Sequence, residues 1–115
     1  MPTFNYWYIF PNFGWGIFIL GGKNMRVVTT NCDSRVPLST QLTMWWMYDN
    51  TGAEERDYFH VFELTAKEGC QEIFHYQEQP EWQETLISFT DEAVTEKVYI
   101  INDGDHETML LAEDY

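Results

Sequence analysis

The chain has 115 residues, of which 44% are hydrophobic and 17% aromatic, and nineteen acidic against six basic residues give a formal net charge of −13. The length fits one domain spanning residues 1–115, and the aromatic content excludes an intrinsically disordered chain, because disordered segments are poor in aromatic side chains. The charge argues against direct binding to nucleic acid or to an anionic membrane, since both interactions need clustered Lys and Arg.

The first 24 residues are an aromatic-rich extension that contains no acidic residue. Residues 3–10 are dense in aromatic and β-branched side chains, which is typical of a strand, and further strands are expected over 14–20 and 25–30. No apolar run here approaches the roughly 20 residues that a membrane span requires, and no basic region precedes one as in a signal peptide. The sequence therefore predicts a cytoplasmic protein.

One long helix is expected over residues 37–50. Pro37 suits its first turn, and Asn50 and Gly52 suit its end. Apolar residues recur in it at i, i+4 and i+7, which predicts the face that packs on the core. That face consists of Leu38, Leu42 and Trp45, with Trp46 beside them.

The second half of the chain predicts strands separated by turns. Residues 58–65 are apolar on both sides, as in the interior strand of a sheet. Further strands are expected over 71–77, 82–89, 96–101 and 107–112, the last two joined by an Asp-Gly turn that is typical of a hairpin. The expected fold is α+β, with a mostly antiparallel sheet packed against one main α-helix.

The remaining motifs argue against catalysis. The cysteines, Cys32 and Cys70, and the three histidines match no zinc-binding spacing, and no nucleotide-binding loop or nucleophile motif is present. We therefore predict no enzymatic activity, no cofactor and no metal. One alternative stays open, a small metal-dependent enzyme that uses His60 and His75 if paired strands bring them together.

Acidic side chains are the candidate binding residues. All nineteen lie within residues 33–115, which carry a net charge of −15. Carboxylates at i and i+2 of a strand stand about 6.6 Å apart on one face, a spacing comparable to that of phosphates along a nucleic-acid strand. The predicted partner-binding residues are Glu54, Glu55, Asp57, Glu68, Glu72, Glu78, Glu81, Glu84, Asp103 and Asp105.

Several segments resemble a small family known only as domain of unknown function nine-sixty. They are VPLSTQLTMWWM, DYFHVFEL, QEIFHYQEQPEW, KVYIINDGD and the ending TMLLAEDY, and the resemblance covers about residues 25–115. The resemblance implies a compact α+β cytosolic protein that occurs in staphylococci, other Firmicutes, and their phages and mobile elements. It implies no established activity and transfers no catalytic residue.

Two functions follow as hypotheses. The first is a non-enzymatic inhibitor or adaptor, encoded by a phage or mobile element, that mimics nucleic acid and binds a basic groove of a nucleic-acid-processing protein such as a CRISPR nuclease. By analogy, small acidic phage proteins often inhibit host nucleases, including as anti-CRISPR proteins. The alternative is a structural or regulatory homodimer that associates through the aromatic residues of the N-terminal extension. Those residues are Phe4, Tyr6, Trp7, Tyr8, Phe10 and Trp15.

Overall fold

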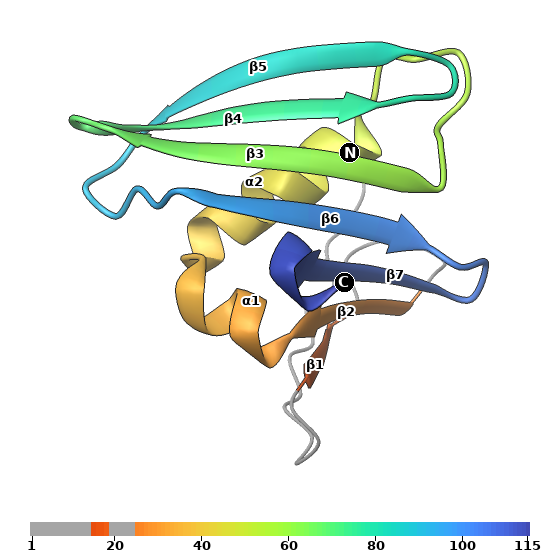
Figure 1. The fold of residues 1–115 in the computed structure, drawn as a ribbon, viewed down its shortest axis with the longest axis horizontal. Helices are drawn as coiled ribbons and strands as arrows, with labels where there is room; N and C mark the ends of the chain where they lie inside the picture. The colour runs from red at the N-terminus through yellow and green to blue at the C-terminus, as the bar shows by residue number, and fades with distance from the viewer. Residues whose placement is uncertain (1–14, 19–24) are drawn as a thin grey trace.

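The computed structural model describes residues 15–18 and 25–115 and has an α+β fold, as predicted. Seven strands form one sheet in the order β1-β2-β7-β6-β3-β4-β5. The elements are β1 (Trp15–Phe18), β2 (Met25–Thr29), α1 (Thr30–Arg35), α2 (Leu38–Asp49), β3 (Phe59–Lys67), β4 (Cys70–Gln77), β5 (Trp82–Phe89), β6 (Glu96–Asn102), β7 (His106–Leu111) and the 3-10 turn η1 (Ala112–Asp114). Figure 1 views the sheet from the face opposite α2, which lies behind β3 and β6.

The sheet is mixed rather than simply antiparallel. Five of its six strand pairings are antiparallel, but β2 lies beside β7, the last strand of the chain, and runs parallel to it. A parallel pair needs a long crossover, and here everything from α1 to β6 forms it. The strand expected over residues 3–10 lies outside the described residues, whereas β1 falls within the expected 14–20.

Two helices are present where one was expected. Strand β2 ends at Thr29, whose hydroxyl accepts a hydrogen bond from the Cys32 backbone N–H at 3.3 Å and so caps α1. Helix α1 stops before Val36, which is extended (φ −109°, ψ 120°), because a residue that precedes a proline disfavours helical backbone. Pro37 then opens α2, whose bounds agree with the prediction.

The predicted buried face of α2 is right only in part, because Trp45 is buried as expected but Leu38 and Trp46 are exposed. Its buried side chains include Gln41, Met44, Trp45 and Tyr48, whereas Leu38 is 49% and Trp46 54% exposed. Apolar residues occur on several sides of α2, so spacing alone did not select the buried face. A polar residue marks that face, since the Gln41 amide donates to the Val36 carbonyl at 2.8 Å and to Asp33 at 3.0 Å.

The two faces of the sheet carry different side chains. Beneath the helices lies the core, which includes Phe62, Ile73, Ile100 and Met109 packed with Trp45. The opposite face lacks α1 and α2, and we call it the uncovered face, although the C-terminal Tyr115 contacts Phe59 and Tyr99 on it. It carries partly buried aromatic side chains and exposed apolar ones at its β5 side. They are Phe59, Phe74, Tyr76 and Tyr99, with Ile87 at 47% and Phe89 at 89% exposure.

Candidate functional site

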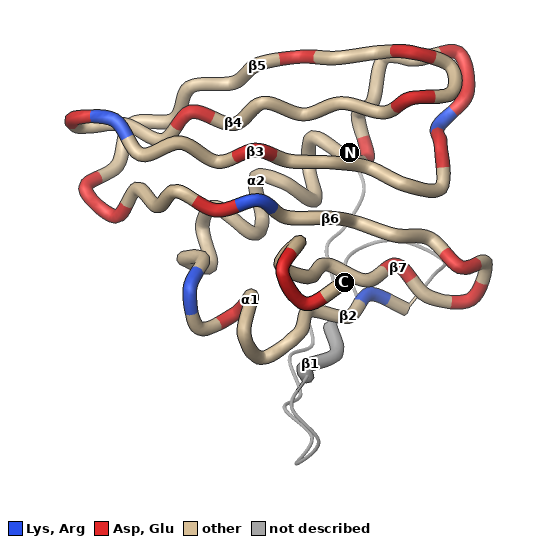
Figure 2. Tube along the Cα trace, viewed as in Figure 1, with Lys and Arg blue, Asp and Glu red and all other residues tan. Residues whose placement is uncertain are grey.

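Seven of the ten predicted acidic residues gather at one end of the sheet. Strands β4 and β6 end there and β3, β5 and β7 begin there, so the loop 50–58 meets the turns 78–81 and 103–105 (Figures 1 and 2). We call these three segments the acidic end. It contains Glu54, Glu55, Asp57, Glu78, Glu81, Asp103 and Asp105.

Gln77 holds the acidic end together. Its buried side-chain oxygen accepts a hydrogen bond from the Asp57 backbone N–H at 3.0 Å, and its side-chain nitrogen donates to the carbonyls of Glu55 at 2.9 Å and Pro80 at 2.8 Å. The backbone N–H of Asn102 donates to the Tyr58 carbonyl at 2.8 Å. These bonds tie the loop to both neighbouring hairpins, so the carboxylates are carried on an ordered backbone.

The arginines near this end are engaged with the interior. Arg56 is the one basic residue in the three segments, and its guanidinium lies 4.2 Å from the Tyr48 ring centroid and donates to the Tyr48 carbonyl at 3.2 Å. Buried Arg26 donates to Glu107 at 3.0 Å and also binds Asp49. Their positive charge therefore stabilises buried or half-buried acids instead of neutralising the exposed ones.

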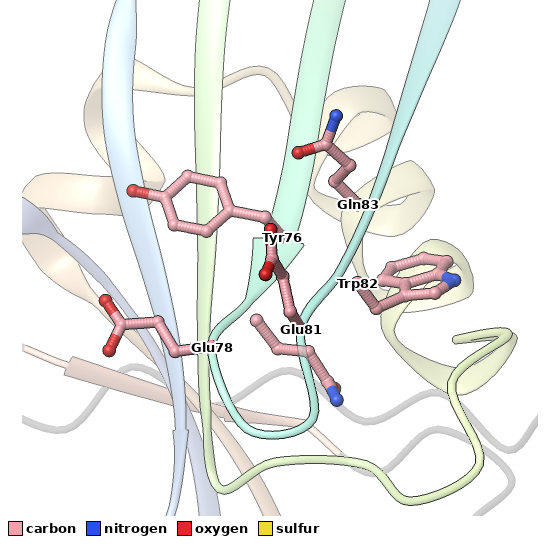
Figure 3. A pocket seen from close by; sticks show the side chains of 6 residues that line it. Tyr76, Glu78, Glu81, Trp82 and Gln83 are labelled. Carbon is pink, nitrogen blue, oxygen red and sulfur yellow. The ribbon is translucent and has the colours of Figure 1, made fainter.

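Glu78 and Glu81 carry exposed carboxylates beside a hollow at the acidic end. Together with Tyr76, Gln77, Trp82 and Gln83 they line an open hollow of about 310 Å³ (Figure 3). Within the described residues, neither carboxylate accepts a hydrogen bond. Asp103 differs, because the backbone N–H groups of Asp105 and His106 donate to it and lower the pKa of its carboxyl group.

Three predicted residues do not belong to this group. Glu68 lies in the turn at the opposite end of the sheet, Glu72 pairs with Lys67 at 2.8 Å, and Glu84 points beneath the sheet toward His75. The seven that gather all lie on loops or turns, so the predicted row of carboxylates with strand spacing does not form. Glu72 and Glu84 are the two that do lie on strands, and each has a partner. Glu72 pairs with the basic Lys67, and Glu84 accepts a hydrogen bond from His75.

His60 and His75 lie together, but their side chains hydrogen-bond to each other instead of facing a shared metal ion. The Nδ1 of His60 lies 2.7 Å from the Nε2 of His75, and the Nδ1 of His75 lies 2.9 Å from a carboxylate oxygen of Glu84. Both rings are fully buried, and Phe62 stacks on His75 with ring centroids 4.1 Å apart. Burial lowers the pKa of each imidazole to about 4, so both are neutral at pH 7.

Neutral rings fix the direction of this hydrogen-bonded chain. Glu84 accepts from the Nδ1–H of His75, whose Nε2 then accepts from the Nδ1–H of His60. Two nitrogens only 2.7 Å apart leave no room for a metal ion between them, because each zinc–nitrogen bond is about 2.0–2.1 Å long. In the described ranges, 15–18 and 25–115, no three His, Cys, Asp or Glu residues are arranged to hold a metal ion.

Sequence reasoning placed His60 beside His75 across paired strands, as a candidate metal site, but it missed the hydrogen bonds of Gln77 and the contact of His75 with Glu84. His60, His75 and Gln77 alternate with outward-facing residues on their strands, so their inward orientation was predictable. The partners of Gln77 and the contact with Glu84 were not, because they come from the path of the loop 50–58 and from the register of β4 against β5. Cys32 is buried, and burial raises the pKa of its thiol to about 12, which keeps it protonated. No helix of the described residues is long and apolar enough to cross a membrane.

Comparison with known proteins places the chain in a family of similar fold. A family model described as "Staphylococcal protein of unknown function (DUF960)" matches residues 25–114, whereas no curated protein matches. A solved structure, that of a protein of unknown function from Enterococcus faecalis, is similar with a TM-score of 0.66 and 19% sequence identity, covering 78% of this chain and 89% of that one. At this identity the likeness shows the fold alone. The family match extends from β2 to η1, and the chain therefore belongs to the DUF960 family.

Proposed function

We propose that this protein is a non-enzymatic adaptor or inhibitor that binds a basic groove of a nucleic-acid-processing protein through its acidic end. The observation that carries the proposal is the meeting of seven mostly exposed carboxylates on three segments whose one arginine, Arg56, contacts Tyr48, Asp49 and Glu107 instead of these carboxylates. A CRISPR nuclease is one partner of this type, by analogy with small acidic inhibitors of phages and mobile elements. The cytoplasm is the compartment in which such a partner is met.

The fixed backbone geometry of the acidic end favours a role in binding a partner over a role in solubility alone. A solvated acidic surface needs no fixed geometry, whereas Gln77 makes three hydrogen bonds that position the loop and one turn. The opposite end of the sheet also carries acids, but its bases are engaged with them, as in the Arg35–Glu113 and Lys67–Glu72 pairs. A basic partner would therefore meet the greater unpaired negative charge at the acidic end.

The test is a pair of matched charge reversals in full-length protein. Glu78→Lys with Glu81→Lys changes two free carboxylates of the acidic end, and Glu68→Lys with Glu113→Lys makes the same change of charge at the opposite end. Immobilised wild-type protein is expected to capture a nucleic-acid-binding protein from host lysate and to release it at about 0.5 M salt, since salt screens exposed charges. The acidic-end variant is expected to lose this capture, and the control variant is expected to keep it.

Two further results decide the matter once a partner is captured. A nucleic acid that the partner binds should release the partner from the immobilised protein, because the nucleic acid and the acidic end would occupy the same basic groove of the partner. Capture that is indifferent to salt, or equal for both double variants, contradicts the proposal.

The homodimeric module is the second candidate, and the uncovered face favours it. Exposed Ile87 and Phe89 are apolar side chains of the kind that a partner subunit covers. The N-terminal aromatic residues proposed for this contact lie outside the described residues, apart from Trp15 in β1. Deletion of residues 1–22 followed by measurement of molar mass tests this candidate. If the truncated protein has the same number of subunits as the full-length protein, the candidate is removed.

A further inference from the structure

Strand β5 forms one edge of the sheet and is open to pairing. It follows β4 in the sheet order and has no strand on its other side among the described residues; in Figure 1 it is the uppermost strand. Its eight residues pair with β4 in continuous register from Trp82 to Phe89, without a bulge. Proteins usually protect an edge with lysine, proline, a bulge or an inward-pointing charge. The sequence of β5, WQETLISF, has no lysine, proline or bulge, and its one charged residue, Glu84, points beneath the sheet toward His75.

The β5 residues whose backbone N–H and C=O groups point away from β4 can be identified, because these groups alternate in direction along the strand. Thr90 donates its backbone N–H to the Gly69 carbonyl at 3.2 Å, and this pair continues the register in which Phe89 faces Cys70. Backbone groups alternate in direction along an antiparallel ladder, so the residues an even number of positions from Thr90 point toward β4. Those that point outward are therefore Gln83, Thr85, Ile87 and Phe89, whose side chains are also exposed.

Both ends of this open edge are acidic. Glu78 and Glu81 lie before β5, and Asp91 and Glu92 follow it, all of them exposed. No lysine, arginine or histidine occurs between residues 82 and 95. The edge thus presents four uncharged residues in its middle and two carboxylates at each end.

We propose that β5 accepts an extended segment of the basic partner as an additional strand. Eight strand residues span about 26 Å, so the segment has about eight residues, uncharged β-branched or apolar in the middle and Lys or Arg at both ends. This inference rests on the proposed function and specifies how the partner is held. A second copy of this chain is a poorer occupant, because antiparallel β5–β5 pairing would bring Glu78 and Glu81 against Asp91 and Glu92.

A synthetic peptide provides the probe. It has nine residues, with two arginines at each end and alternating valine and threonine between them, and its binding to full-length protein is followed by fluorescence anisotropy. A peptide of the same sequence, N-methylated at alternate residues on the pairing edge, keeps the charge but cannot pair. Wild-type protein is expected to bind the unmodified peptide at least roughly tenfold more tightly, because the modified peptide loses several backbone hydrogen bonds.

Proline substitutions test the strand itself. Thr85→Pro removes one outward N–H and leaves the bonds to β4 intact, so the fold is expected to persist. It should weaken peptide binding roughly tenfold, while Thr85→Ala, which keeps the N–H, should change it by less than about twofold. Ile87→Pro repeats the test at the next outward position. Bound peptide should also slow amide hydrogen exchange at Gln83, Thr85, Ile87 and Phe89.

Several outcomes overturn the inference. The first is that the N-methylated peptide binds as tightly as the unmodified one, and the second is that folded Thr85→Pro and Ile87→Pro variants bind the peptide as wild type does. The third is that the wild-type protein is a dimer which Thr85→Pro converts to a monomer, since this would assign the edge to a second copy. Failure of the proposed function is distinguishable. If Glu78→Lys with Glu81→Lys abolishes capture of the natural partner but both proline variants retain it, the acidic end is the binding site and β5 is not.

Discussion

The two faces of the sheet differ in how they place their polar and apolar side chains. The face beneath α2 buries Arg26, Glu107, His60 and His75, whereas the uncovered face exposes Phe89 and other apolar side chains. Buried polar groups contribute little net stability, but each must find its partner, and so they define one arrangement of the elements. We infer that the covered face specifies the fold and that the uncovered face, with its β5 edge and acidic end, is available for binding.

The largest expected effect comes from breaking the buried ion pair. Arg26→Met leaves Glu107 buried without its 3.0 Å partner, and among the described residues Arg56, at 3.9 Å, is the remaining base that pairs with it. We expect the free energy of unfolding, measured by urea denaturation, to fall by about 3–5 kcal/mol. Arg35→Met is the matched control, because its ion pairs with Glu96 and Glu113 are partly exposed and such pairs contribute little to stability.

A double substitution distinguishes the effect of an unpaired buried charge from the effect of lost packing. Replacing both partners, Arg26→Met with Glu107→Leu, should recover much of the lost stability, since no buried charge is then left unpaired. If Arg26→Met costs no more than Arg35→Met, the covered face does not depend on this pair, and the comparison between the faces fails.

The next effect is a loss of stability in mild acid. The folded-state pKa of His60 and of His75 is about 4, below the ordinary value of 6.5, so the unfolded chain takes up protons first as the pH falls. Their contribution is complete above about pH 6.5 and is lost toward pH 4. Burial raises the pKa of Glu84, which partly offsets this loss. Between pH 7 and 5 we expect the free energy of unfolding to fall by on the order of 2–4 kcal/mol.

Variants assign this pH dependence to the buried pair. His60→Phe with His75→Phe should flatten the pH profile, whereas His106→Gln should leave it unchanged, because His106, at the start of β7, is only half buried and lies apart from the buried pair. A wild-type profile that is level from pH 7 to 5 would show that the histidines are not held neutral by burial.

Local sequence signals predicted most elements of the fold but not their arrangement. Helix α2, the β6–β7 hairpin and the interior position of β3 followed from capping residues, an Asp-Gly turn and an apolar strand. The parallel pairing of β2 with β7 could not be predicted, because it joins residues about 80 positions apart and leaves no local pattern. The predicted buried face of α2 was right for Trp45 and wrong for Leu38 for a related reason, since the sheet beneath the helix, and not the helix's own periodicity, selected Gln41 over Leu38.

The candidate site was predictable in composition and only partly in place. Acidic residues near turns were expected to be exposed, and the antiparallel topology brought three such turns to the same end. Glu72 and Glu84 had the same local signature, yet each has a partner that only the folded structure supplies, Lys67 in one case and His75 in the other. Charge alone therefore does not separate the binding carboxylates from those that stabilise the fold.

The smallest expected effect sharpens the comparison between the faces. Phe89 is a large apolar residue on the uncovered face, yet with 89% of its surface exposed it buries little area. Phe89→Ser should therefore change the free energy of unfolding by less than about 0.5 kcal/mol. Ile73→Ala, beneath the helices, should cost about 2–5 kcal/mol because it leaves a cavity in the core. Urea denaturation of both variants checks the contrast, and a loss above about 1 kcal/mol for Phe89→Ser would mean that this side chain is covered in solution.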